Sequence, residues 1–145
     1  MAASILIAFG FGWMVAGAFL GLYLGAKHPA HLDHLGVAAA EGNLAVYHRA
    51  FEAYKWRSSV HAHSMLFSLS SVAVGSLLSR NEFASVSAEA LAGTLMFATV
   101  VWSFSALARI RALMGLSDLL FVASMAWVAV IVARNLWSGD VPLLR

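Results

Sequence analysis

The stretch SILIAFGFGWMVAGAFLGLYLGA (Ser4–Ala26) decides the fold, because no charged residue interrupts it. The hydrocarbon core of a bilayer is about 30 Å thick, and a helix of about 20 apolar residues crosses it. The residues before the stretch carry no positive side chain, and its apolar run is longer than that of a usual signal peptide. We therefore expect a retained membrane-spanning helix.

Three further apolar runs follow, at 60–78, 88–108 and 116–133. Hydrophobic residues make up 61% of the chain and charged residues 11%, and the mean hydropathy is +0.81. Backbone polar groups in lipid must be satisfied within the segment, and these runs are too long and too evenly apolar for barrel strands. The sequence predicts one all-α integral membrane domain over 1–145, a four-helix bundle with spans at about 4–26, 60–78, 88–108 and 116–133.

The connection between the first two spans, 27–59, holds most of the polar residues. Pro29 is acceptable in a first helical turn and Gly36 is a helix stop, so HPAHLDHLG predicts a short helix. NLAVYHRAFEAYKW has apolar residues at helical spacing, with Tyr54 and Trp56 suited to a membrane interface. We expect one or two short amphipathic helices against the bundle, the second of them continuous with the span at 60–78.

Several features have a structural explanation that needs no chemistry. Gly17, Gly21 and Gly25 form a smooth stripe that admits another helix or a flat ligand, and ordinary helix packing is its simplest reading. Ser117 followed by Asp118 predicts a helix N-cap with an acid in the first turn. Cysteine is absent, which excludes disulfides and thiolate metal sites, and the net charge of +2 gives no indication of nucleic-acid binding.

All six histidines lie between positions 28 and 63, at one membrane face of the predicted bundle: His28, His31, His34, His48, His61 and His63. Imidazole is the commonest neutral metal ligand and an axial ligand of haem iron. His31 and His34 can share a helix face and a metal ion. His28 can instead cap a helix, and His48 beside Arg49 is expected to be solvated.

His61 and His63 stand at the start of a predicted span, where polar side chains are costly and indicate function. Two residues on a helix are separated by about 200°, so these imidazoles point to nearly opposite sides and cannot both bind one ion. Interface histidines that hydrogen-bond to backbone are the alternative. The candidate metal ligands are therefore His61, His63, His31 and His34.

The stretch RSSVHAHSMLF (57–67) resembles the second helix of the catalytic subunit of haem–copper oxidases and nitric-oxide reductases. That helix carries a histidine, then a methionine or aliphatic residue, then a phenylalanine, which His61, Met65 and Phe67 match. GLYLGAKH is similar to part of small four-helix bacterial membrane proteins related to that subunit. The resemblance implies that His61 is an axial ligand of haem b, with His63 as a secondary candidate.

Further cofactor-binding residues follow from the same resemblance. The other axial position can be supplied by His28 or His34, by a methionine, or by a residue of a partner chain. Arg57, one turn from His61, can pair with a haem propionate. Copper or another transition metal is the alternative cofactor. The spans at 88–108 and 116–133 contain no histidine, so the chain lacks the remaining ligands of a full oxidase.

The sequence thus favours a redox-related membrane subunit that binds haem b or a metal ion, in a larger respiratory or oxidoreductase complex of a bacterial inner membrane. The alternative is a cofactor-free structural subunit that packs against other membrane chains. No nucleotide loop, paired catalytic carboxylates or Ser-His-Asp arrangement is visible, so we do not expect a complete enzyme. The expected partners are lipid and other membrane subunits or further copies of this chain.

The two indications of orientation disagree. Six lysines and arginines lie at the histidine-bearing face and three at the other, which places the histidines in the cytoplasm. The oxidase-like helix begins on the outer side, which implies the reverse.

Overall fold

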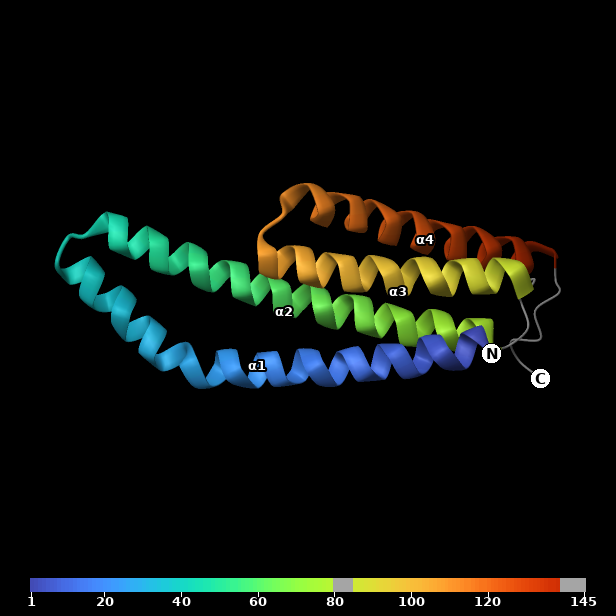
Figure 1. The fold of residues 1–145 in the computed structure, drawn as a ribbon, viewed down its shortest axis with the longest axis horizontal. Helices are drawn as coiled ribbons and strands as arrows, with labels where there is room; N and C mark the ends of the chain where they lie inside the picture. Colours follow the sequence, from blue (N-terminus) through green and yellow to red (C-terminus); the bar gives the residue numbers. More distant parts are fainter. Residues whose placement is uncertain (80–84, 139–145) are drawn as a thin grey trace.

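The computed structural model describes residues 1–79 and 85–138, and this part of the chain forms four helices. They are α1 (Ala2–Ala40), α2 (Leu44–Leu78), α3 (Ser85–Ala108) and α4 (Arg111–Ser138). Figure 1 shows them side by side in chain order, with α1 along α2, α3 next to α2, and α4 outermost. The predicted all-α membrane fold is confirmed.

Within residues 1–79 and 85–138, three helices are long and apolar enough to cross a membrane: Ala2–Ala40, Ser87–Ala108 and Arg111–Asn135. The expected span at 60–78 is helical, but α2 falls short by composition because it carries histidines and a row of serines. Ser64, Ser68 and Ser71 are buried within the bundle. A helix that lies between two others can hold such side chains, since they do not face lipid.

Six of the buried hydroxyls, those of Ser68, Ser71, Thr99, Ser103, Ser117 and Ser124, donate to carbonyls of their own helices. Ser71 donates to the Phe67 carbonyl at 2.8 Å, and Thr99 donates to the Leu95 carbonyl at 2.8 Å. Around them the core is aromatic: the Phe67 ring stacks on Phe121 of α4 with centroids 4.2 Å apart and meets Trp102 of α3 edge-on at 5.7 Å. These contacts join α2 to both helices of the C-terminal pair.

The connection 27–59 is helical except at the turn 41–43, but the expected separate helix from Pro29 to Gly36 is wrong. Both residues lie inside α1, which continues to Ala40, and α2 begins at Leu44 and runs without a break into the 60–78 segment. A proline ring inside a helix crowds the carbonyl four residues earlier and bends the helix. That residue is Gly25, where the surroundings are open, and Figure 1 shows α1 changing direction part-way along.

The two tight turns have ordinary local causes. Gly42 has a φ of +67°, and Asn43 caps α2 by accepting a hydrogen bond from the Val46 amide at 3.2 Å. Arg109 ends α3 with a φ of +60°, while Ile110 N–H donates to the Ser105 carbonyl at 2.8 Å. This pattern is a Schellman motif, in which a left-handed residue closes the helix.

Because α4 begins at Arg111, the expected N-cap at Ser117 and Asp118 is wrong. Ser117 lies within α4, and its hydroxyl donates to the Leu113 carbonyl at 2.8 Å. The apolar run begins at residue 116, five residues after the start of α4. The first apolar residue of the run therefore does not mark the start of the helix.

Candidate functional site: the histidines of the α1–α2 hairpin

The α1–α2 hairpin extends well beyond the turn between α3 and α4, and it carries all six histidines (Figure 1). At a rise of 1.5 Å per residue, α1 is about 58 Å long and α3 about 36 Å. A hydrocarbon core is about 30 Å thick, much shorter than α1, and we infer that the more polar end of the hairpin, residues 27–59, lies outside the apolar layer.

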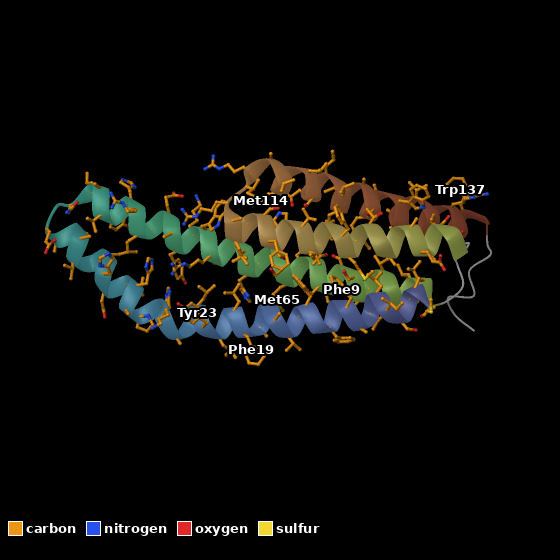
Figure 2. The ribbon with its side chains drawn as sticks, in the orientation of Figure 1. Phe9, Phe19, Tyr23, Met65, Met114 and Trp137 are labelled. Carbon is orange, nitrogen blue, oxygen red and sulfur yellow. The ribbon has the colours of Figure 1, made fainter. Side chains whose placement is uncertain are left out.

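His61 is wedged between α2 and α1. Its Nδ1 lies 3.0 Å from the Gly17 carbonyl, and because a carbonyl only accepts, Nδ1 is the donor; in a neutral imidazole Nε2 then holds the lone pair. The ring also lies against Gly21, where a Cβ would meet Cε1 at 2.7 Å. The glycine stripe of α1 is thus partly filled by the imidazole, and Gly17 also contacts Met65, which Figure 2 shows between the two helices.

His63 faces α3 instead. Its Nδ1 donates to the Ser59 carbonyl at 2.9 Å, and its ring stacks on Trp102 with centroids 4.5 Å apart and planes 12° from parallel. His61 and His63 therefore point to different neighbouring helices, as their spacing predicts. They do not converge on one ion.

A second group surrounds Tyr54 nearer the turn of the hairpin. The Tyr54 hydroxyl is hydrogen-bonded to Nδ1 of His28 at 2.8 Å, and its ring stacks on His31 with centroids 4.3 Å apart. Nε2 of His31 is buried and has no hydrogen-bond partner. The expected role of His28 as a helix cap is wrong, because the residue lies well inside α1.

Burial lowers the pKa of His31, which lies beyond the apolar part of α1, and the nearby positive forms of His28 and His34 and the Arg57 guanidinium lower it further. Each of these groups repels a second positive charge on His31. The remaining histidines, His34 and His48, are exposed. Exposure of His48 agrees with the prediction that it is solvated.

Among residues 1–79 and 85–138, no group of three or more histidine, aspartate or glutamate side chains is arranged to hold a metal ion. The four candidate metal ligands fall into separate settings: His61 against α1, His63 against α3, and His31 beside Tyr54 with His34 exposed. The six histidines lie on the same hairpin, but their imidazoles do not converge on one binding site.

The arrangement does not fit a haem on His61 while α1 keeps this position. A flat macrocycle needs open space in front of a ring nitrogen. Nε2 of His61 instead lies so near α1 that a Cβ at Gly21 would stand 3.1 Å from it. Two nearby cavities have volumes of about 150 and 170 Å³. Arg57 lines both of them, but His61 lines neither.

Sequence reasoning missed the residues that receive the histidines. Gly21 was assigned to a general packing stripe, yet it packs directly against the His61 imidazole, and Trp102 packs against the His63 imidazole. Trp56 was expected at the interface, but its Nε1 also donates to the Ala106 carbonyl at the end of α3, at 3.0 Å. The sequence does not indicate which residue a glycine or a tryptophan will contact in another helix. These pairs become visible only when the register between the helices is known.

Comparisons of the chain with protein-family models, with curated proteins and with solved structures found no match.

Proposed function

We propose that the protein is a small, non-catalytic membrane subunit whose histidines join its helices and thereby hold the α1–α2 hairpin rigid outside the bilayer. The observation that carries this proposal is the hydrogen bond from Nδ1 of His61 to the Gly17 carbonyl. A polar side chain at this depth is costly unless it is used. In this protein the His61 side chain interacts within the molecule, because the imidazole packs into the space left by Gly17 and Gly21 on α1.

The hairpin is the part of the molecule that reaches a partner in this proposal. Beyond the apolar layer it still exposes large apolar side chains, among them Leu32, Val37 and Leu44, whose exposed fractions are 52%, 56% and 67%. In this proposed placement they lie outside the lipid, and apolar patches rimmed by polar residues are typical of protein interaction sites. The proposed partner is another chain of a membrane complex.

The proposal includes an orientation and a membrane. Several cationic residues lie at the end of the bundle from which the hairpin projects: Lys27, Lys55 and Arg57 of the hairpin, and Arg109 and Arg111 at the α3–α4 turn. By the positive-inside rule this end faces the cytoplasm. The resemblance of GLYLGAKH to part of small four-helix bacterial membrane proteins favours a bacterial inner membrane.

The test of partner binding uses the full chain in membranes of its own host. After mild solubilisation, we expect it to migrate in a complex larger than a monomer or dimer, and Val37→Gln with Leu44→Gln should release it. His48→Gln, a polar change in the same hairpin, is the matched control. A wild-type chain that migrates as a monomer or homodimer would refute the proposed hetero-complex.

A haem or metal subunit remains the second candidate, and one observation favours it. A backbone carbonyl that fixes the Nδ1 proton is the arrangement that orients histidine ligands and leaves Nε2 for the metal. This reading requires α1 to move away from His61 at Gly21. An absorption spectrum with metal analysis separates the two candidates.

A further inference from the structure

Cationic side chains gather where the apolar parts of the helices end on the hairpin side. Lys27 follows the apolar part of α1, Arg57 precedes the apolar part of α2, and Arg109 with Arg111 forms the turn from α3 to α4. All four are exposed. Phosphate groups of lipid lie at this depth in a bilayer, just beyond the hydrocarbon.

Two of these arginines line the same cavity because Trp56 fixes α2 against the end of α3. The Trp56 Nε1 donates to the Ala106 carbonyl at 3.0 Å, and the left-handed Arg109 closes α3 three residues later. Arg57 is adjacent to Trp56 in the chain. The two arginines therefore come from α2 and from the α3–α4 turn, and both line one cavity.

The cavity, of about 150 Å³, lies where α1, α2 and α3 meet. Its lining is Arg57 and Arg109 together with Leu20, Trp56, Val60 and Leu107. All six side chains are cationic or apolar. Leu20, Val60 and Leu107 belong to the apolar parts of their helices, so the site has a charged side toward the water and an apolar side toward the bilayer.

A larger neighbouring cavity, of about 380 Å³, continues the positive surface. Arg49, Arg109 and Arg111 line it, with Glu52 as the one acid. Arg109 and Trp56 belong to both cavities. Arg49 and Arg111 thus add two positive charges near the smaller cavity against the one negative charge of Glu52, and this balance favours an anion.

We propose that this junction binds an anionic phospholipid, with the phosphate between Arg57 and Arg109 and an acyl chain along Leu20, Val60 and Leu107. Guanidinium groups bind phosphate through two parallel hydrogen bonds, and basic pockets between membrane helices bind anionic headgroups. A zwitterionic lipid carries its own cation at the headgroup and gains less from the two arginines. A free phosphate ion gains nothing from the apolar side.

The test is native mass spectrometry of the full chain in detergent, with phosphatidylglycerol or phosphatidylcholine of the same chain length added. We expect selective retention of phosphatidylglycerol. The double variant Arg57→Gln, Arg109→Asn should weaken it about thirtyfold, the factor that corresponds to about 1 kcal/mol for each lost cation. Asparagine suits the left-handed backbone at Arg109, so the turn is kept.

Arg134→Gln in α4, far from this turn along the helix, is the control and should retain the lipid like the wild type. Circular dichroism of the double variant checks that its helices are intact. Equal retention of phosphatidylcholine, or unchanged retention by a folded double variant, would overturn the proposal. Displacement of the lipid by equimolar inorganic phosphate would also overturn it, because the site would then be one for the free ion.

Discussion

The Nδ1 atom of His61 in α2 donates a hydrogen bond to the Gly17 carbonyl of α1, 44 residues away in sequence, at 3.0 Å. A carbonyl inside a helix already accepts one bond from its own helix and has a second lone pair available. The imidazole therefore satisfies its donor without breaking the α1 ladder. The bond fixes the register in which the two longest helices pack.

The notch at Gly21 should tolerate no side chain while His61 is present. Gly21→Ala places a Cβ 2.7 Å from Cε1 of the ring, next to the Nδ1 atom that the Gly17 carbonyl holds in place, and we expect a loss of about 1–3 kcal/mol in stability. Gly12→Ala, in the same helix with open surroundings, should cost nothing. Thermal unfolding of both variants in detergent, followed by circular dichroism, measures the difference.

Removal of the imidazole should relieve that clash. His61→Ala alone loses a hydrogen bond of about 1 kcal/mol. In combination with Gly21→Ala the two losses should be less than additive, because the added methyl group then enters space vacated by the ring. Strict additivity in this double-mutant cycle would show that the ring and Gly21 do not touch.

Trp56 should contribute more to the stability of the fold than a tryptophan that only lies at the membrane interface. Trp56→Phe keeps most of the ring but removes the Nε1 donor to Ala106, and we expect a loss of about 1 kcal/mol. The control is Trp127→Phe in α4, where the exposed fraction is 58%. Equal unfolding temperatures for the two variants would contradict a role for this bond.

The protonation of His31 gives a test by pH. Its pKa is lowered, so its NMR titration midpoint should lie below the ordinary value of 6.5. As the pH falls below 6.5, the unfolded chain binds this proton before the folded chain does, and this group's contribution to stability decreases. Arg57→Gln should raise the midpoint only slightly, since burial is the largest cause and Arg57 the smallest. A midpoint at or above 6.5 would contradict the burial.

The fold was readable from the sequence because it follows from apolar runs of membrane length. The helical character of the connection and its continuity into the 60–78 segment were also predicted. The helix break at Pro29 and the N-cap at Ser117 were not, since local signals lost to longer-range packing: α1 continues past its proline because α2 lies alongside it. The position of the preceding turn, at Arg109 and Ile110, determined where α4 begins, and the N-cap pattern at Ser117 did not.

For the candidate site, the sequence placed the histidines at one face and separated His61 from His63 correctly. It did not say what each imidazole touches, because Gly21, Tyr54 and Trp102 acquire their roles only when helices come into register. The motif around His61 is compatible with a haem ligand or a packing wedge. Chemistry of one side chain does not distinguish these uses; the space in front of its Nε2 does.

The most direct test of the central claim is the absorption spectrum and metal content of the chain purified from membranes of its own host, for the wild type, His61→Ala and His48→Ala at equal membrane levels. If the histidines join helices, all three lack a Soret band and stoichiometric metal, and His61→Ala differs only by a lower unfolding temperature. A Soret band or bound metal that the wild type and His48→Ala share and His61→Ala has lost would contradict it.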